Sequence, residues 1–580
     1  MTDDLFDLNG LAASIAGTLA GLLAEAGADV AAAPAVELAP AQRAEHGDLT
    51  TNAALVSAKL ARTAPRDLAA TLGERWLAGP GGAVCERVEV AGPGFLNLFL
   101  NDIWYAGAVD RVVAEGADYG RGALSADRRV KMNVEFVSVN PTGPLHVGHA
   151  RYASYGDALC RIFDFVGHDV TREFYVNDHG TQMTRFAQSL AARYGQRLGL
   201  DAPVPEEGYQ GEYLLDLADA LIAERGERYK DAVAAAPGVE ALDAETLQEL
   251  KVWGRDAILA SFRLTLERLR VPFDVWTPES TLYQGEGEHR GFHGEVGKSL
   301  AELDGEKLLY DEDGACWLRT TEYGDDKDRV LIRQTGEPTY FLSDIAYHRD
   351  KMDRGFAHMI DIWGADHHGY VPRMKAAFTA LPPHDPDKLE LIIGQLVNLL
   401  ESGEARRMSK RKGDIVTVDD LIDAVGVDAA RFLLVGRSQD TTLELDIDVA
   451  REQSNKNPVY YVQYAHARIC SILRNLPDGG ERPSGETLPV VPSGPEERAL
   501  ARALARYPLV LLGAAEQRAP HRLYTYLGEL AAEFHVFYRN CRVLVDDADV
   551  AAFREGLCRA TRDVLAGGLA LLGVSAPDAM

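Results

Sequence analysis

The spacing of apolar and polar positions divides the 580-residue chain into three zones. Residues 1–115 begin with alanine-rich helical patterns, and "CERVEVAGPGFLNLFL" (85–100) predicts two strands separated by Gly-Pro-Gly. In residues 116–445, short apolar β-type runs alternate with amphipathic helical patterns. Residues 446–580 carry long amphipathic helical patterns, interrupted by a Pro- and Gly-rich stretch (476–495) that predicts a surface loop.

The middle zone has the alternation expected of a parallel sheet. "VKMNVEFV" (130–137) predicts a strand, the run that ends before Gly167 predicts a helix, and "DVTREFYV" (169–176) predicts the next strand. The same theme recurs at "HMIDIWGAD" (358–366) and "KLELIIG" (388–394). Strands that alternate with helices in this way form an open parallel sheet flanked by helices.

Two segments of the middle zone do not fit this alternation. Residues 195–270 are charged and helical, which indicates a helical insertion. Residues 300–335 contain a predicted hairpin with Asp313-Gly314 at its turn. The predicted fold is therefore multidomain, with a Rossmann-like α/β parallel-sheet domain that carries these insertions, an α+β N-terminal domain and an all-α C-terminal bundle.

Composition excludes several classes of protein. An acidic run precedes the first apolar stretch (11–24), which is the reverse of a signal peptide, and that stretch is short for a membrane span. The six cysteines are scattered with no CxxC pair, so we expect reduced thiols in the cytoplasm and no structural zinc.

Charge is unevenly distributed along the chain. The net charge of −28 argues against indiscriminate nucleic-acid binding. Residues 446–580 nevertheless contain 15 Lys and Arg against 17 Asp and Glu. This nearly neutral, arginine-rich end permits a polyanionic partner.

The stretch "NPTGPLHVGHAR" (140–151) lies after a predicted strand and before a predicted helix. Open α/β sheets bind nucleotides at such a junction, where the helix N-terminus attracts phosphate. Two prolines stiffen the turn, Gly143 permits unusual backbone angles, and Gly148 lets a ligand approach the helix start. His146 and His149 present imidazole donors to the same volume. The alternative is a rigid loop with two ordinary surface histidines.

The stretch "EARRMSKRKGD" (404–414) concentrates five basic residues in seven positions. A mobile basic loop beside a nucleotide site would supply cations as pyrophosphate leaves. The alternative is a solvated charge run or a generic anion patch. The two stretches together, in this order, favour nucleotide chemistry.

These motifs resemble those of the arginyl-tRNA synthetases, a family of class I aminoacyl-tRNA synthetases, in their bacterial form. "HVGH" is similar to the HIGH signature, and "RMSKR" (407–411) is similar to the KMSKS loop, with arginine in place of the first lysine and of the final serine. "EHGDLTTNAAL", "AGPGFLNLFL", "WGADHHGYVPRMKAA" and "YVQYAHARICSI" also resemble that family. "GVDAARFLL" resembles the DALR sequence that names its C-terminal anticodon-binding domain, with Ala430 in place of leucine.

The resemblance implies that the chain joins L-arginine to the α-phosphorus of ATP and then transfers the arginyl group to its cognate tRNA. His146, His149 and Lys410 would be catalytic, and Mg²⁺ would accompany ATP as its counter-ion. The residues implied for ATP binding are Pro144, His146, Gly148, His149, Asp366, His367, Met408, Ser409 and Lys410. Asp366 and His367 could alternatively bind a metal together with His368, although no fourth ligand is evident.

Arginine selection requires carboxylates, because a guanidinium is planar, permanently charged and best held by two parallel hydrogen bonds. By resemblance, Glu135, Tyr340 and Asp344 form the recognition pocket, while Asn140 and His146 hold the amino and carboxylate end of the substrate. Which acid faces the guanidinium stays open. Alternatively, Glu135 lies on a solvent face and Asp344 caps a helix.

Contacts with tRNA are implied at both ends of the chain. Phe95 and Asn97 would meet the tRNA elbow, and Tyr460, Tyr464 and Arg468 offer stacking surfaces on one predicted helix. An aromatic stripe at helical spacing is more often part of a core, so we expect only one or two of these residues to reach RNA.

Three other functions compete with this interpretation. An HxGH nucleotidyltransferase that makes an activated small molecule shares the histidines, but such enzymes are usually single small domains. A catalytically silent tRNA- or protein-binding relative would not need His146, His149 and Lys410, and another class I synthetase would not need two acids for a cationic substrate. The family expectation is a monomer, and no segment suggests an editing domain.

Overall fold

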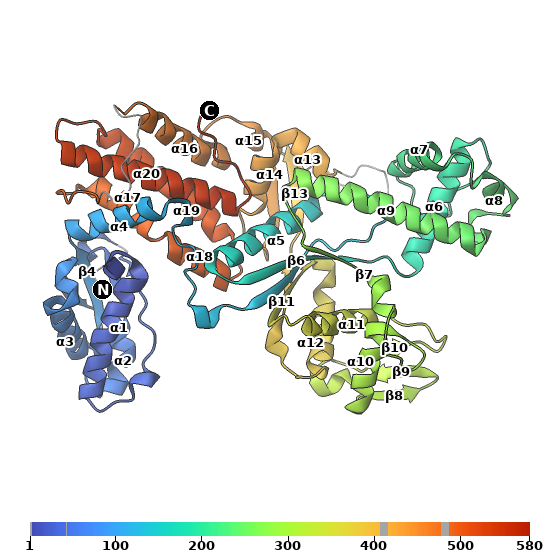
Figure 1. Ribbon diagram of the computed structural model, residues 1–580, viewed down its shortest axis with the longest axis horizontal. Helices are drawn as coiled ribbons and strands as arrows, with labels where there is room; N and C mark the ends of the chain where they lie inside the picture. Colours follow the sequence, from blue (N-terminus) through green and yellow to red (C-terminus); the bar gives the residue numbers. More distant parts are fainter. Residues whose placement is uncertain (1–2, 42, 406–415, 477–486) are drawn as a thin grey trace.

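The computed structural model describes residues 3–41, 43–405, 416–476 and 487–580. Figure 1 shows a central α/β domain with the N-terminal and C-terminal domains on one side of it and two inserted groups of elements on the others. The predicted fold class is confirmed.

A five-stranded parallel sheet forms the centre of the molecule, in the order β12-β11-β5-β6-β7. Its strands are β5 (Lys131–Glu135), β6 (Asp169–Val176), β7 (Val275–Pro278), β11 (His358–Gly364) and β12 (Leu389–Gly394). The apolar side chains of β5 and β11 are buried from both sides, as expected for a sheet covered by helices. The helices that cover this sheet include α5 (Val147–Val166), α11 (Tyr340–Asp353) and α12 (Val371–Ala380).

Helix α5 is buried along most of its length because its apolar residues occur on every side. Its Gly156 makes room for the ring of Phe136, since a Cβ there would lie 2.4 Å from the ring. The helix ends at Gly167, whose φ of 118° is in the left-handed region, as predicted from the sequence.

The first insertion is a group of helices between β6 and β7, drawn in green at the right of Figure 1. It contains α6 (Thr181–Arg197), α7 (Tyr213–Arg225), α8 (Lys230–Ala235) and α9 (Ala244–Arg268). The group starts at Thr181 and not at the predicted residue 195. The sequence of α6 has the periodicity of a helix that covers a sheet, but its apolar face packs on α7 and α9 instead.

The second insertion contains α10 (Gly294–Gly305) and a three-stranded antiparallel sheet. The strands are β8 (Leu309–Glu312), β9 (Ala315–Leu318) and β10 (Arg329–Ile332). Asp313 and Gly314, with φ of 51° and 77°, join β8 to β9 in the geometry of a primed two-residue turn, which confirms the predicted hairpin.

A small sheet that the sequence did not predict follows the central domain. Strand β13 (Val397–Glu401) pairs in parallel with β15 (Leu443–Asp446) and antiparallel with β14 (Glu404–Ala405). Helices α13 (Val418–Val425) and α14 (Val427–Leu434) lie between β14 and β15, and α15 (Ile447–Arg451) follows.

The N-terminal domain packs helices on a four-stranded antiparallel sheet in the order β1-β2-β4-β3. Its strands are β1 (Ala39–Pro40), β2 (Leu49–Thr51), β3 (Cys85–Ala91) and β4 (Phe95–Leu100), and the last two are the strands predicted on either side of Gly-Pro-Gly. Its helices are α1 (Leu8–Glu25), α2 (Ala53–Ala61) and α3 (Pro65–Ala78), followed by α4 (Asp102–Glu115).

Helix α1 is longer than the predicted apolar stretch. Among the described residues it is the one helix whose length and composition would allow it to cross a membrane. Leu11, Ile15, Leu19 and Leu23 bury one face of it within the N-terminal domain, as in the core helix of a folded domain.

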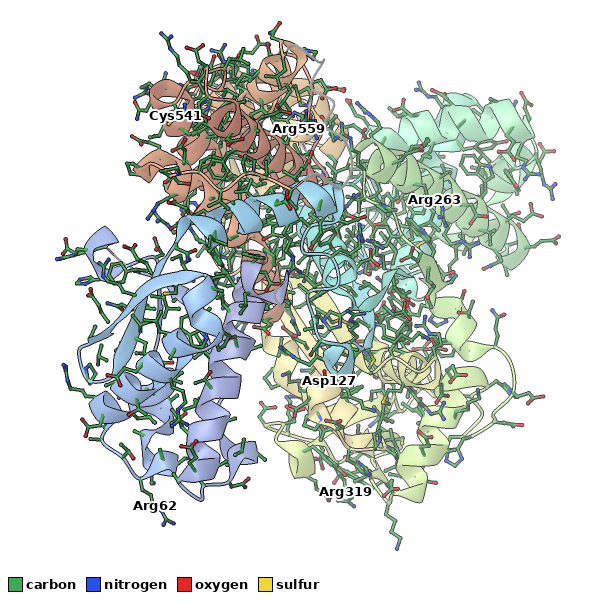
Figure 2. The ribbon with its side chains drawn as sticks, turned by 60° about the vertical axis from the view of Figure 1, so that its left-hand side comes forward. Arg62, Asp127, Arg263, Arg319, Cys541 and Arg559 are labelled. Carbon is green, nitrogen blue, oxygen red and sulfur yellow. The ribbon has the colours of Figure 1, made fainter. Side chains whose placement is uncertain are left out.

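The C-terminal bundle consists of α16 (Pro458–Arg474), α17 (Pro495–Ala505), α18 (Tyr507–Glu516), α19 (His521–Asn540) and α20 (Ala548–Leu571). Figure 2 shows Arg559 and Cys541 on this bundle, while Arg62 and Arg319 lie at the far ends of the N-terminal domain and the second insertion. All six cysteines are buried and free.

Candidate active site

The order of the central sheet defines where a ligand would bind. Strand β5 lies between β6, which follows it in the chain, and β11, which belongs to the second half of the domain. Between β5 and β11 the chain connections therefore leave in opposite directions, and open α/β sheets bind their ligands in the crevice at such a point. The HVGH stretch follows β5, and the 3-10 helix η10 (Ala365–Tyr370) follows β11.

His146 and His149 lie together at the start of α5. Their rings are stacked, with centroids 3.5 Å apart and planes 25° apart. The backbone N–H of His146 donates to Nδ1 of His149 over 3.1 Å. A neutral His149 therefore carries its proton on Nε2, where it is a donor. The helix N-terminus adds its own positive potential at the same point.

The structure corrects the roles assigned to two glycines. A Cβ on Gly148 would lie 3.0 Å from the ring of His146, so this glycine makes room for the imidazole, and the predicted role of admitting a ligand is not needed to explain it. Gly143 does not have a positive φ. The left-handed backbone occurs earlier, at Val137 and Ser138, with φ of 69° and 38°. A β-branched residue in this region is strained, and such strain concentrates at functional sites.

The described residues on either side of the basic stretch are those of β14 before it and Val416 after it. Met408, Ser409 and Lys410 lie outside the described residues. The chain returns at Val416, whose carbonyl accepts the backbone N–H of Val147 over 3.1 Å, and the N–H of Val418 donates to Leu145. Thr417 forms an isolated β-bridge with His146.

Asp366 and His367 lie on η10, on the other side of the same crevice. Their side chains are largely exposed, at 83% and 53%, and are 3.5 Å apart. The ring of His367 lies 5.8 Å from that of Trp363, at the end of β11. Both residues therefore border the carboxyl edge of the sheet, as the sequence predicted.

Glu135 is buried and already has a cationic partner. It is 5% exposed, and the ammonium of Lys351 donates to its Oε2 over 2.7 Å. This contradicts the alternative interpretation of Glu135 as a solvent-facing residue. The partner lies 216 positions further along the chain.

Asp344 has a different environment from Glu135. The Tyr370 hydroxyl donates to its Oδ2 over 2.5 Å, and no basic side chain is paired with it among the described residues. Burial raises the pKa of Asp344 to about 6, although Tyr370 and His348 lower it. It lies in the interior of α11, which begins at Tyr340, so it does not cap that helix.

Glu279 is a functional candidate that the sequence interpretation missed. It lies on the 3-10 helix η8 (Glu279–Tyr283) and is 1% exposed, and among the described residues no basic side chain forms an ion pair with it. Burial raises its pKa to about 7, the Ser343 hydroxyl lowers it, and the neighbouring Asp344 raises it further. A buried carboxylate without a cationic partner is costly, so this position is suited to a cationic ligand. No local motif marks Glu279.

Asn140 and Tyr340 each lie beside the start of α6. The side-chain amide of Asn140 donates to Gln182 over 2.5 Å. Tyr340 is 51% exposed, and a Cβ on Gly180 would lie 2.7 Å from its hydroxyl. The first insertion therefore adjoins both the loop before α5 and the start of α11.

The residues predicted to contact tRNA lie on two separate surfaces. Tyr460 and Tyr464 are partly buried and stacked at 6.1 Å, and the exposed Arg468 lies 5.7 Å from the Tyr464 ring and 5.2 Å from that of Tyr538. In the N-terminal domain Phe95 is half-buried, whereas Asn97 is only 6% exposed.

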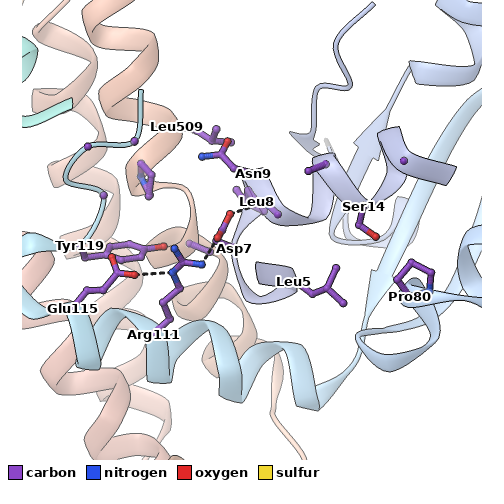
Figure 3. A pocket seen from close by; sticks show the side chains of 18 of the residues that line it. Leu5, Asp7, Leu8, Asn9, Ser14, Pro80, Arg111, Glu115, Tyr119 and Leu509 are labelled. Atoms are coloured by element: carbon purple, nitrogen blue, oxygen red, sulfur yellow. Dashed lines mark hydrogen bonds and ion pairs between the residues drawn. The ribbon is translucent and has the colours of Figure 1, made fainter. Parts of the chain in front are cut away.

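A cavity of about 970 Å³ lies away from this chemistry, between α1, the end of α4 and the start of α18. Figure 3 shows Arg111 between Glu115 and Asp7 at its wall, with both carboxylates paired to the guanidinium. Its lining offers neither the histidines nor the acids described above, so we do not assign the predicted reaction to it.

His466, Cys470 and Asp578 form a group whose ligand atoms lie within 4.8 Å of one another. Burial and the Asp578 carboxylate raise the pKa of the Cys470 thiol to about 11. The thiol lies 3.5 Å from Asp578 and can donate to it, so the contacts are explained without a metal.

Comparison with known proteins agrees with this geometry. The chain matches the model for the class I (R) tRNA synthetase catalytic domain over residues 109–469, the arginyl tRNA synthetase N-terminal domain over 10–100 and the DALR anticodon binding domain over 462–580. The parallel sheet with paired histidines at its switch point is the catalytic domain of a class I aminoacyl-tRNA synthetase.

The chain belongs to the arginyl-tRNA synthetase family. It is 46% identical to an arginine–tRNA ligase from Syntrophotalea carbinolica, with 94% of this chain and 95% of that protein covered. A relative in Bacillus subtilis is 42% identical with the same coverage. The solved Thermus thermophilus arginyl-tRNA synthetase superposes with a TM-score of 0.74 at 25% identity, covering 98% of this chain and all of that one.

One motif assignment needs correction. The stretch "GVDAARFLL" lies on α14, within the region matched by the catalytic model and outside residues 462–580 of the DALR domain. Its Arg431 is fully buried, donates to the carbonyl of Leu572 after α20, and pairs with Asp157 of α5. The stretch therefore joins the two domains, and does not lie within the anticodon-binding bundle.

Proposed function

We propose that the chain attaches L-arginine to its cognate tRNA through an arginyl-adenylate, releasing AMP and pyrophosphate. The observation that carries this proposal is the β-bridge between His146 and Thr417, which brings the chain just after the basic stretch to the paired histidines. The rival nucleotidyltransferase is not favoured, because the chain also has the N-terminal and DALR domains.

The adenylation step is an in-line displacement that concentrates negative charge on phosphoryl oxygens. Catalysis therefore depends on positioned positive charge and N–H donors. His146 and His149 supply donors at the start of α5, and Lys410 meets the departing pyrophosphate. Mg²⁺ enters as the counter-ion of ATP. Pro144 and Gly148 shape the turn that holds the two imidazoles, and Gly148 does so by leaving space for His146.

The remaining contacts with ATP come from both sides of the crevice. Asp366 and His367 border it on η10, beside the adenosine half of the substrate. Met408, Ser409 and Lys410 precede Val416 in the sequence, and the carbonyl of Val416 accepts the backbone N–H of Val147 in α5.

Asp344 and Glu279 receive the guanidinium of arginine. Neither acid is paired with a cation among the described residues, and both are buried enough for their pKa values to rise, to about 6 and about 7. Glu135 is less suited to that role because Lys351 already pairs with it. Tyr340, Asn140 and His146 hold the remainder of the substrate.

These two acids explain how arginine is selected without a separate editing site. Lysine lacks the planar fork that can bridge two carboxylates, and a neutral amino acid would leave both buried acids without a cationic partner. A site built around such groups can discriminate by about 10⁴-fold or more.

The tRNA lies across the C-terminal bundle and the N-terminal domain. Arg468 with Tyr464 and Tyr460 offers a surface on which unstacked bases rest. Phe95 is the accessible member of the N-terminal pair, because Asn97 is nearly buried. We further propose that the protein acts as a monomer in the cytoplasm, which sedimentation velocity and cell fractionation would test.

The test is ATP–pyrophosphate exchange with each amino acid, with and without tRNA. We expect exchange with arginine and only in the presence of tRNA. Exchange with another amino acid, or robust exchange without tRNA, would contradict this expectation. His149→Ala is expected to reduce exchange by about 10²–10³-fold, the usual cost of one donor to a developing charge.

A further inference from the structure

Three carboxylates lie side by side across the central sheet. In the register of the parallel strands, Glu135 of β5 is the partner of Asp361 on β11 and of Glu173 on β6. All three are buried, at 5%, 0% and 0% exposure. Like charges on neighbouring strands repel one another, so this row requires cations.

One face of α11 and the residue after it supply these cations. Lys351 donates to Glu135 over 2.7 Å and to Asp361 over 2.8 Å. Arg354 donates to both oxygens of Glu173, over 2.8 and 3.0 Å. His348, Lys351 and Arg354 follow one another at intervals of three residues.

His348 completes the arrangement beside the substrate pocket. Its Nε2 lies 2.7 Å from Oδ2 of Asp361, and its Nδ1 lies 2.7 Å from the backbone carbonyl of Asp344. The burial of Lys351 alone would lower its pKa, but the carboxylates of Asp361 and Glu135 outweigh burial and raise it. The ammonium is thus held charged between two acids.

The same helix carries the proposed substrate contacts. Tyr340 is its first residue and Asp344 lies one turn later, while the charged face begins at His348. The position of α11 on the sheet, and hence of Asp344, is therefore set where the cations meet the carboxylate row. A displacement of about 1 Å in a positioning element can cost about 100-fold in activity.

We propose that Lys351 is a positioning residue for arginine: by neutralising Glu135 and Asp361 it fixes α11 on the sheet and holds Asp344 at the guanidinium without touching substrate. This rests on the proposed function. The ATP contacts lie on α5 and η10, so they should be less affected than arginine binding.

The experiment compares steady-state charging and calorimetric arginine binding of the full-length protein and its variants. We expect Lys351→Met to raise the KM and the Kd for arginine about 10–100-fold, with the KM for ATP within about twofold of wild type. Asp361→Asn, which keeps the shape and an acceptor for Lys351, should shift arginine binding in the same direction by less. If Lys351→Met does not fold, Asp361→Asn tests the proposal instead.

Arg349→Gln is the matched control. Arg349 is on the same helix but pairs with Glu295, Glu302 and Asp353, away from the carboxylate row. Its KM for arginine should stay near that of wild type.

The proposal is overturned if folded Lys351→Met and Asp361→Asn bind arginine as wild type does, or if arginine and ATP constants rise in parallel. It is also overturned if Arg349→Gln weakens arginine binding equally. Wild-type protein that does not charge arginine would instead refute the proposed function.

Discussion

Arg431 donates to Asp157 over 2.5 Å, and neither side chain is exposed to solvent. The guanidinium also donates to the carbonyls of Leu269 and Leu572, so one side chain joins α14 and α5 to the ends of α9 and α20. Gly573 is part of this arrangement, because a Cβ there would lie 2.3 Å from the guanidinium.

We expect Arg431→Met to destabilise the protein by about 2–4 kcal/mol, since the buried Asp157 carboxylate loses its fully buried partner and keeps Arg161 at 2.7 Å and Arg172 at 3.7 Å. Urea denaturation followed by tryptophan fluorescence and by far-UV circular dichroism measures this loss. Arg128→Met is the control, because Arg128 pairs with Glu516 at similar distance but with 56% and 49% of the side chains exposed. Such a surface pair contributes about 1 kcal/mol or less, and equal effects of the two changes would contradict the prediction.

Short-range signals in the sequence predicted the strand, loop and helix on which the paired histidines lie. The HVGH stretch, the glycine at the end of α5 and the Asp313-Gly314 turn each depend on residues within a few positions, so strand, loop and helix could be predicted. The strained backbone at Val137 and Ser138 could not, because no residue type marks it.

The acids required long-range information. Glu135 and Asp344 were both candidates from the sequence, but the partner of Glu135 is a lysine on a helix far along the chain. Only the packing of α11 on the sheet distinguishes the two. No sequence motif marks Glu279, and its burial without a cationic partner is evident only from the structure. The three-residue spacing of His348, Lys351 and Arg354 is visible in the sequence and would have predicted a basic face on this helix.

Arginine binding should weaken as pH falls. Asp344 and Glu279, with pKa values raised to about 6 and about 7, must be ionised to hold a guanidinium that stays charged throughout. The KM for arginine should therefore rise between about pH 8 and about pH 5.5, and Asp344→Asn should make this dependence shallower. A KM for arginine that is constant over this range would refute the assignment of these acids.

The stability of the protein without arginine should change with pH in the opposite direction from arginine binding. A raised pKa means that the folded state holds the proton more tightly than the unfolded chain, so these two groups stabilise the fold below about pH 4 and lose that contribution as pH rises through 6 and 7. Saturating arginine should reverse this trend, because the ligand stabilises the ionised form. Melting temperatures with and without arginine, each compared with those of Asp344→Asn, measure the difference.

Gly148→Ala should impair catalysis without unfolding the protein. The new Cβ would lie 3.0 Å from Cε1 of His146, which must move, whereas alanine is the better helix former. We expect kcat for arginine-dependent exchange to fall by about 10–100-fold with little change in the KM for arginine. Gly143→Ala in the same loop is the control, because its Cβ would make ordinary contact with Tyr213 at 3.4 Å. Equal losses in both variants would mean that the loop, and not the imidazole, is responsible.

Arg468→Gln should weaken tRNA binding and leave adenylation chemistry intact when tRNA is saturating. Arg468 is exposed beside Tyr464 and Tyr538, where a phosphate or an unstacked base could meet it. We expect the KM for tRNA to rise and the slope of log affinity against log salt to become shallower by about one, because one phosphate contact is lost. The control Arg319→Gln removes a similar arginine–tyrosine pair, with Tyr310 at 4.6 Å, on the second insertion. If Arg319→Gln changes the salt slope as much, the effect reflects total charge, and the surface of α16 is not the tRNA site.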